Sequence, residues 1–301
     1  MSGETLKYCG ATIARPVTRC GVDRSGRPAQ VTLRPAGPGS GIWFVRNTAS
    51  RTRAWPVSVR HRAEAGWQPC DWTQAVRATV GNAVTRGYET CLGQGIRTVR
   101  MVEHLLAACY GLGVTDLLVE TSGSRLPLLD GSAQPYVTAM MQAGMVRYQV
   151  GPRTAHLRRP LLVQSGTRFI AAFPASRLTI NCFVQLPRIG PQYVSFVETA
   201  GAFVRDIARA RTFGWVDLPS ARQRLGLRFG LRKVTGRGQH GAFVYPARWR
   251  LTCEPCRHKV LDLVGDLALL GRPVGAELFA FRPGHDINLE FVRKLERALK
   301  E

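Results

Sequence analysis

One order of secondary-structure signals occurs twice along this chain of 301 residues. In each half, a helical pattern of apolar residues precedes a strand pattern, a turn and a second helical pattern. Two copies are too few for a solenoid. We therefore predict two domains of related topology, residues 1–150 and 151–301, joined near 150–159. The signals fall at 99–110, 114–121, 130–131 and 132–145, and again at 254–270, 274–281, 283–284 and 286–300.

The first 98 residues carry weaker signals. Short strand patterns at Val31–Leu33 and Ile42–Val45 alternate with turns rich in glycine and proline. Residues 61–98, which contain two tryptophans and two cysteines, show no clean period. We interpret this stretch as an insert in the first domain or as a mobile loop.

The composition is that of a folded globular protein, because 45% of the residues are hydrophobic and 21% are charged. No run approaches the roughly 18 uninterrupted apolar residues of a membrane-spanning helix. The N-terminus lacks a basic region followed by an apolar one, so no secretory signal is expected. These features predict a cytoplasmic protein.

Charge is the unusual part of the composition. Lys and Arg number 42 against 20 Asp and Glu, which gives a formal net charge of +22, and nearly all the cations are Arg. Arginine binds phosphate and carboxylate through a planar fork, so an anionic partner is favoured: nucleic acid, a phosphorylated metabolite or an acidic membrane face. Because the arginines are spread along the chain, a base-composition bias of the source genome explains them equally well.

The eight cysteines are too sparse for a disulfide scaffold, and without a secretory signal reduced thiols are expected. Cys253 and Cys256 form a C-x-x-C pair, but no second pair exists to complete a zinc ribbon. Metal or redox use of this pair is therefore the less favoured interpretation.

Histidines beside carboxylates interrupt two of the apolar helical patterns. His258 and Asp262 are four residues apart, so they share one helix face and can contact one cation, and Asp266 continues that stripe. Glu103 and His104 stand together in the other helix. The alternatives are a solvated polar face and a hydrogen-bonded core histidine. Half-burying such acids without a cation is costly, which favours a metal site.

A further histidine, His285, lies at the turn between a strand and a helix, where functional residues are common. Zinc hydrolases combine three protein ligands, an open position for water and a nearby carboxylate base. The histidines and acids named above supply that inventory. The chain has no H-E-x-x-H, no P-loop and no G-x-S-x-G motif, which argues against zincins, P-loop enzymes and serine hydrolases.

Five short motifs follow one another along the chain. They are M-V-E-H-L-L-A-A-C-Y-G-L-G at 101–113, L-L-D-G-S-A-Q-P at 128–135, A-R-T-F-G at 210–214, R-H-K-V-L-D-L-V-G-D at 257–266 and G-H at 284–285. In this order and spacing they resemble the UDP-3-O-acyl-N-acetylglucosamine deacetylases, zinc amidases of lipid A biosynthesis. The resemblance covers most of the chain. It implies an α+β fold of two domains, each a layered α/β sandwich, with the active site between them.

The resemblance also implies a cofactor and substrate contacts. Zn²⁺ would be held by His104, His258 and Asp262, with iron as the alternative ion. Lys259 would contact the phosphate side of an acylated UDP-GlcNAc substrate, and Phe213 would pack on its sugar.

The catalytic roles follow from the same resemblance. Glu103 would act as general base on the attacking water. His285, oriented by Asp266, would stabilise the oxyanion and protonate the leaving amine, and Thr212 would donate to the oxyanion. Such an acid and base need environments that push their pKa values apart.

This chain departs from the family pattern in places. A Gly-Leu-His-Thr-Gly segment reads Gly21-Val-Asp-Arg-Ser-Gly26 here, and a Gly-Gly-Ser loop after 210–214 is absent. A divergent paralogue that deacetylates another N-acetylated sugar nucleotide or glycolipid precursor therefore stays open, as do the acyl-chain length and the oligomeric state.

The arginine excess suits two roles in such an enzyme, binding the UDP diphosphate and contacting the inner membrane face. No nucleic-acid partner is expected. A basic nucleic-acid-binding protein is the remote alternative. It is disfavoured because such a protein would not need the complete set of metal ligands and acid–base residues that this chain carries.

Overall fold

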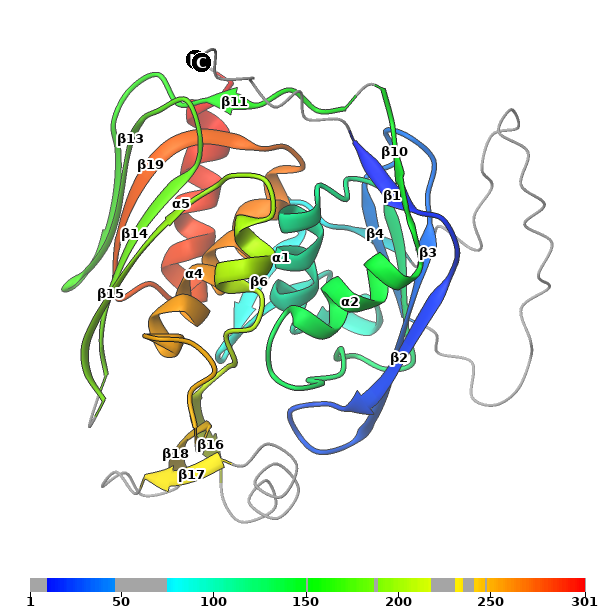
Figure 1. Ribbon diagram of the computed structural model, residues 1–301, viewed down its shortest axis with the longest axis horizontal. Helices are drawn as coiled ribbons and strands as arrows, with labels where there is room; N and C mark the ends of the chain where they lie inside the picture. The colour runs from blue at the N-terminus through cyan, green and yellow to red at the C-terminus, as the bar shows by residue number, and fades with distance from the viewer. Residues whose placement is uncertain are drawn as a thin grey trace.

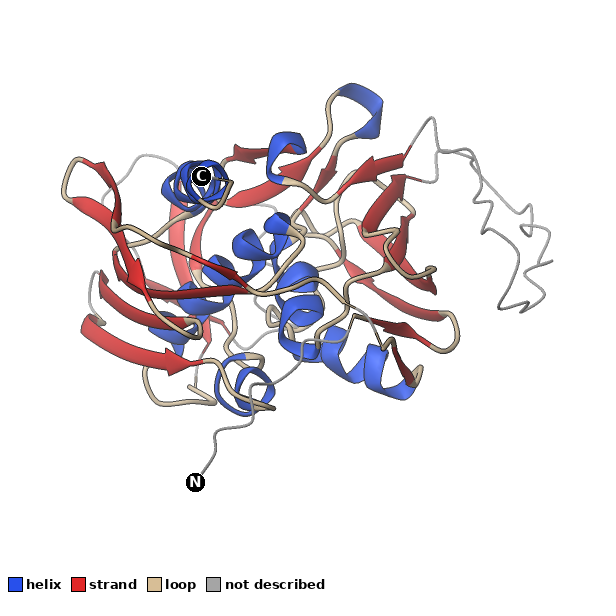
Figure 2. Cartoon of the chain, turned by 90° about the horizontal axis from the view of Figure 1, so that it is seen from above, coloured by secondary structure: helices blue, strands red, loops and turns tan. Residues whose placement is uncertain are grey.

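The computed structural model describes residues 10–46, 75–149, 151–186, 189–217, 231–234, 241–246 and 248–300. Two β-sheets lie on opposite sides of the molecule, and the described α-helices lie between them (Figure 1). Figure 2 shows the same arrangement from above. This is the mixed α+β architecture that the sequence predicts. No helix in these ranges is long and apolar enough to span a bilayer.

The two sheets have the same strand order and directions. In each, the third and fourth strands pair in parallel and the other neighbours are antiparallel. This equivalence confirms the related topology of the two halves. The first sheet runs β2 (Val17–Val22), β3 (Pro28–Pro35), β9 (Leu117–Thr121), β4 (Ile42–Arg46) and β5 (Ala75–Arg77). The second runs β12 (Leu161–Ser165), β13 (Arg168–Pro174), β19 (Val274–Phe281), β14 (Thr179–Leu186) and β15 (Gly190–Val197).

Two helices from each half fill the interior: α1 (Glu103–Leu112) and α2 (Gln134–Gln142), then α4 (Glu254–Leu267) and α5 (His285–Ala298). The 3₁₀ turn η5 (Ala268–Leu270) extends α4, and the π-helix η4 (Phe203–Ile207) precedes the A-R-T-F-G motif. Gly113 ends α1 because it adopts a left-handed conformation, with φ of 71°.

The first two helices begin later than the sequence predicts, and α2 also ends earlier, at Gln142, because Met145 belongs to the strand β10 (Met145–Arg147). Residues 99–100 form the short strand β8, so α1 begins only at Glu103. Ser132 is not the N-cap of α2, because α2 begins two residues later, at Gln134. The Ser132 hydroxyl accepts a hydrogen bond from the Gln134 N–H at 3.2 Å. Asp130 draws Ser132 into a turn by accepting from its N–H and its hydroxyl, and local side-chain bonds of this kind compete with helix formation.

Direct packing of α1 on α4 joins the two halves. Gly265 of α4 lies so close to α1 that a Cβ atom there would be 2.2 Å from the carbonyl oxygen of Glu103. Apolar residues of both halves consequently form one continuous buried cluster. The division of the chain near 150–159 stays a prediction.

Each half carries extra strands before its first helix. In the first half, η2 (Val80–Asn82), β6 (Ala83–Arg86), β7 (Glu89–Leu92), η3 (Gly95–Arg97) and β8 (Val99–Arg100) precede α1. In the second half, β16 (Gly214–Asp217), β17 (Leu231–Val234) and β18 (Gly241–Pro246) precede α4. Of three more strands, β1 (Ala11–Ile13) and β10 (Met145–Arg147) pair with each other, and β11 (Ala155–His156) pairs in parallel with the first residues of β19.

The stretch 61–98 is thus more regular than its sequence indicates. Its described part, from residue 75 onward, forms strands, and residues 61–74 lie outside the described residues. The mobile-loop interpretation is wrong for residues 75–98, where β5, β6 and β7 pair in antiparallel ladders and the 3₁₀ turns η2 and η3 lie between and after them.

Candidate metal centre and active site

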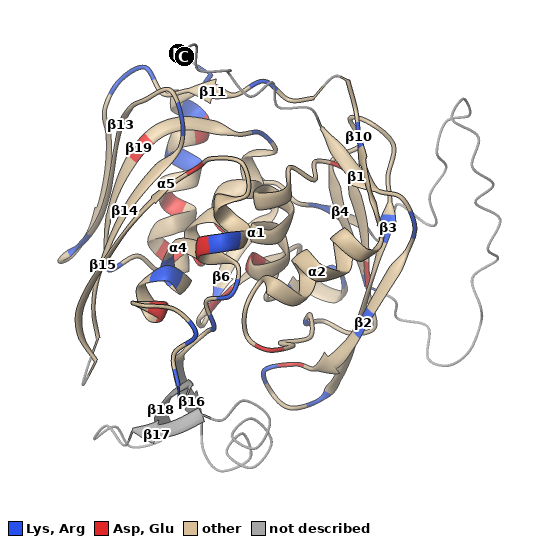
Figure 3. Cartoon of the chain, viewed as in Figure 1, with Lys and Arg blue, Asp and Glu red and all other residues tan. Residues whose placement is uncertain are grey.

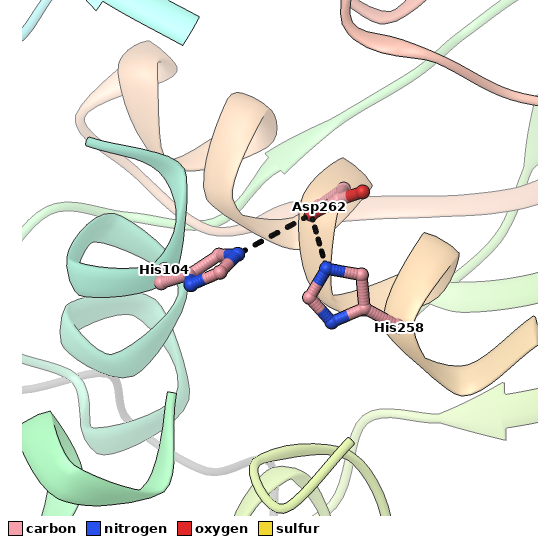
Figure 4. Close-up of side chains that lie close together, drawn as sticks. All are labelled: His104, His258 and Asp262. Atoms are coloured by element: carbon pink, nitrogen blue, oxygen red, sulfur yellow. Dashed lines mark ion pairs between the residues drawn. The ribbon is translucent and has the colours of Figure 1, made fainter. Parts of the chain in front are cut away.

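Two helices bring the three predicted metal ligands together. His104 is the second residue of α1, and His258 and Asp262 lie one turn apart on α4. Asp262 Oδ1 is 3.3 Å from His258 Nε2 and 3.9 Å from His104 Nε2, and Figure 4 shows both rings directed at that carboxylate. All three side chains are buried, so the ligand atoms are withdrawn from bulk water.

The protonation states of these ligands suit a cation. The Ala210 carbonyl accepts a hydrogen bond from His258 Nδ1 at 3.0 Å, which leaves the Nε2 lone pair facing the other ligands. Burial, together with His258, lowers the pKa of His104 to about 3. Burial alone would raise the pKa of Asp262, but the neighbouring His258 and Lys259 outweigh it and keep the carboxyl ionised.

One buried atom of this group has no hydrogen-bond partner within the described part of the chain. Asp262 Oδ1, the oxygen nearest both imidazoles, is buried and accepts no hydrogen bond. An orphaned buried acceptor costs about 1–3 kcal/mol, and more when it is charged. A divalent ion between two imidazole nitrogens and this oxygen removes that cost, so the residues fit a metal.

An acid–base pair lies beside the metal ligands. Glu103 opens α1 and His285 opens α5, with 3.9 Å between Glu103 Oε1 and His285 Nε2. Burial raises the pKa of Glu103 to about 8. For His285 burial acts against the charged form, but Asp266, Asp262 and Glu103 together outweigh it and raise its pKa to about 9. The imidazolium is therefore favoured at neutral pH.

Asp266 holds His285 in place from the side away from Glu103. Its Oδ2 is 3.0 Å from His285 Nδ1 and accepts from Asn288 Nδ2 at 2.9 Å. Its Oδ1 accepts from the Thr90 hydroxyl at 2.6 Å. These contacts are consistent with the predicted role of Asp266, which is to orient the His285 ring.

Two of these neighbours are absent from the sequence prediction. Asn288 follows His285 by three residues on α5, and that helical spacing could have revealed it. Thr90 belongs to β7, inside the stretch without a period, and no local signal marks it.

The A-R-T-F-G segment forms another wall of the site. The Thr212 N–H donates to the Gly131 carbonyl at 2.7 Å, so this segment is tied to the first half of the chain. Arg211 donates to the buried Glu254 from its backbone N–H at 2.9 Å and from Nε at 2.7 Å. Ala210 provides the carbonyl that orients His258.

The two predicted substrate contacts lie at this wall. Lys259 Nζ is 2.9 Å from Asp262 Oδ2 and 5.4 Å from the centre of the Phe213 ring. Phe213 in turn lies 6.0 Å from the His258 ring. The structure therefore brings eight of the nine predicted site residues into one cluster, and Thr212 lies beside them in the A-R-T-F-G segment, where its hydroxyl role stays a prediction.

The C-x-x-C pair does not form a site of its own. Cys253 is the half-buried N-cap of α4, with φ of 54°. Cys256 is buried, and its thiol donates to the Cys182 carbonyl at 3.2 Å. Among the described residues, the one group of potential metal ligands is His104, His258 and Asp262.

Comparison with known proteins gives consistent matches. A family model described as UDP-3-O-acyl N-acetylglycosamine deacetylase matches residues 10–297, which include every residue of this site. The UDP-3-O-acyl-N-acetylglucosamine deacetylase of Trichormus variabilis is 34% identical over 298 residues, covering 94% of this chain and 97% of the relative. The protein of the same name in Solibacter usitatus is 32% identical, covering 94% of this chain and 90% of the relative. The one in Chlamydia pneumoniae is 31% identical, covering 98% of this chain and 99% of the relative.

Proposed function

Since the chain belongs to the UDP-3-O-acyl N-acetylglycosamine deacetylase family, we propose that it hydrolyses the acetamide of UDP-3-O-acyl-N-acetylglucosamine in lipid A biosynthesis. The reaction would take place at a zinc ion held by His104, His258 and Asp262. The observation that carries the proposal is that the ligand atoms of these three buried side chains lie within 4.8 Å of one another, and that one of them, Asp262 Oδ1, has no hydrogen-bond partner among the described residues. Zinc held there would supply Lewis acidity toward the amide carbonyl and the attacking water.

Glu103 serves as the base. Because burial raises its pKa, Glu103 is a stronger base than an exposed glutamate, and a cation held by the neighbouring metal ligands would favour its ionised form. The Thr90 N–H donates to Glu103 Oε2 at 3.1 Å, which leaves Oε1, on the His285 side, to accept the proton of water as the water oxygen adds to the acetyl carbon.

His285 serves as the acid. Its Nε2 faces the site while Nδ1 contacts Asp266, so the proton on Nε2 is available to the substrate. The imidazolium and the Thr212 hydroxyl stabilise the oxyanion. When the C–N bond breaks, the electron pair stays on nitrogen and His285 protonates it, giving acetate and the free amine.

Lys259 and Phe213 supply the substrate contacts in this proposal. The ammonium of Lys259 is half-buried beside the Phe213 ring, so one face offers a cation for the diphosphate and an apolar surface for the sugar. The family assignment favours neither a divergent paralogue nor a nucleic-acid-binding protein.

The test is turnover of the acylated UDP-sugar by purified protein before and after chelation, together with metal analysis. We expect bound zinc, loss of activity on chelation and recovery on adding zinc. His258→Ala should lose both metal and activity. Full turnover by metal-free protein, or by this variant, would contradict the proposed site, and iron in the native protein would correct the metal alone.

A further inference from the structure

Aromatic side chains form one row across the outer face of the second sheet. Phe169, Phe281, Phe183 and Tyr193 occupy paired positions on β13, β19, β14 and β15 in turn. The rings of Phe169 and Phe281 stack 5.7 Å apart, and those of Phe183 and Tyr193 lie 4.5 Å apart. Phe279 packs edge-on against Phe173 on the same face. These six residues, with Leu162 and Val197, are called the aromatic face below.

The aromatic face is the main exposed apolar area in the described part of the chain. Among the described residues, ten large hydrophobic side chains are exposed, and five of these ten belong to the aromatic face. An outward sheet face is ordinarily polar while the inward face packs on the core. A contiguous apolar area of this kind marks an interaction site. The five are Leu162, Phe173, Phe183, Tyr193 and Val197, each between 42% and 51% exposed.

The first half of the chain provides an internal comparison. On β2 and β3, the equivalents of β12 and β13, several outward side chains are polar and paired, whereas on β9, β4 and β5 the outward side chains Leu118, Val45 and Ala75 form a small buried apolar cluster with Trp43. The hydroxyls of Thr18 and Thr32 lie 2.9 Å apart, and Arg34 pairs with Glu120 at 2.8 Å. The apolar cluster on the first sheet is buried, whereas five residues of the aromatic face on the second sheet are exposed.

Charge around the aromatic face indicates the partner. Segments 151–200 and 274–284 contain seven arginines and two glutamates, and six of the arginines are among the described residues. In Figure 3 the basic residues of this sheet colour its connecting loops, and the strands are nearly free of charge. The one acid on the face itself, Glu277, accepts a hydrogen bond from Asn181 at 3.0 Å. Exposed Arg159 and Arg177 lie in the segments before β12 and between β13 and β14.

An aromatic area bordered by arginines matches the interface of an anionic bilayer, where aromatic rings lie at headgroup depth and arginine contacts phosphate. A second copy of the chain is the weaker match, because each copy has a net charge of +22 and the two repel. We propose that the aromatic face is the surface by which this protein docks on an anionic membrane. Docking goes beyond the deacetylation and does not involve the metal centre.

The experiment is co-sedimentation of the full chain with vesicles of phosphatidylglycerol and phosphatidylethanolamine, and with neutral phosphatidylcholine vesicles. We expect binding to the anionic vesicles that weakens as salt rises. Replacing Leu162 and Phe173 by Ser should lower that binding about tenfold or more, because affinity scales with the inserted apolar area. The control Met141→Ser, which removes an exposed apolar side chain elsewhere, should bind like the unmodified protein.

A second variant, Arg159→Gln with Arg177→Gln, tests the electrostatic part without touching the aromatic face, and it remains informative if the first fails to fold. It should lower binding to anionic vesicles and reduce its salt dependence. Unchanged binding by both variants, or no binding by the unmodified protein, would overturn the proposal. A concentration-dependent dimer that the Leu162/Phe173 variant abolishes would assign the face to self-association instead.

Discussion

Thr90 connects the two members of the acid–base pair. Its side chain is fully buried; its hydroxyl donates to Asp266 and its backbone N–H to Glu103. The same hydroxyl lies 3.0 Å from His285 Nδ1. We therefore interpret Thr90 as a positioning residue that fixes where Asp266, and through it His285, can lie.

Thr90→Val keeps the shape of this side chain and removes its hydroxyl. A hydrogen bond to a charged group contributes about 1.5–3 kcal/mol, so kcat should fall roughly 10- to 100-fold. Bound metal and KM should be unchanged, because Thr90 contacts neither the metal ligands nor the substrate-contact residues. Thr90→Ser restores the hydroxyl and should recover most of kcat; if it does not, the role of Thr90 is packing alone.

Glu103→Gln tests the base directly. The amide is nearly the size of the carboxylate but cannot accept the proton of water. We expect kcat to fall by about 10²–10⁴ while metal analysis shows an occupied site. Activity within a few-fold of the unmodified enzyme would mean that another group takes the proton.

Local spacing explains which site residues are predictable. His258 and Asp262 are recognisable because a helix places residues four apart on one face. Glu103 and His104 stand out as polar residues in an apolar pattern. Thr90 reaches Asp266 across 176 positions of sequence, and no periodicity encodes a contact of that range.

At the level of secondary structure, the crossing of α1 and α4 sets the metal site. Gly→Ala inside a helix ordinarily stabilises by about 0.5–1 kcal/mol. At Gly265 the added methyl would meet the Glu103 carbonyl at 2.2 Å, and backbone cannot yield as a flexible side chain does. The clash should therefore dominate.

Gly265→Ala should lower the free energy of unfolding by about 1–3 kcal/mol and weaken metal binding, since the ligands lie on both helices. Urea titration and metal titration measure the two effects. Gly81→Ala is the matched control, because nothing lies within 4 Å of a Cβ there. Equal stability of the two variants would show that α1 and α4 can separate freely.

The first turn of α4 is tied to the A-R-T-F-G segment by Glu254. Burial alone would raise the pKa of Glu254, but hydrogen bonds from Arg211 and Arg250 outweigh it and lower the pKa. A carboxyl whose pKa is lowered on folding adds stability above its unfolded pKa of about 4.3, and that stability is lost as pH falls through the folded pKa.

Glu254→Gln should therefore destabilise the protein most at neutral pH, by about 3–5 kcal/mol, the usual cost of breaking a buried ion pair. The difference from the unmodified protein should shrink as pH falls below about 4. Urea titrations at pH 7 and at pH 3 to 4 measure it. A difference that stays constant over this range would show that the pair does not depend on ionised Glu254.

At the level of the whole molecule, the order of helices and strands was predictable and the order of strands within the sheets was not. Each helix and the strand after it carry their own apolar period. The parallel pairing of β4 with β9, and of β14 with β19, joins segments separated by a helix and long connections. Such pairings depend on the complete core, so a local pattern does not specify them.

The metal ligands come from both repeated halves, His104 from the first and His258 with Asp262 from the second. A bound ion therefore adds a bond between halves that otherwise meet through packing and hydrogen bonds. An ion at 100 times its dissociation constant stabilises the folded chain by about 2.7 kcal/mol. In a chain of this size that raises the midpoint of thermal unfolding by roughly 4 °C.

We expect chelation to lower the thermal midpoint by that amount and added zinc to restore it, while unfolding stays a single transition because the halves share one buried core. His104→Ala leaves both ligands on α4 but removes the one on α1, so its midpoint should hardly respond to chelator. Differential scanning calorimetry with and without chelator distinguishes the outcomes. Two separate transitions after chelation would mean that the ion, and not the α1–α4 contact, couples the halves.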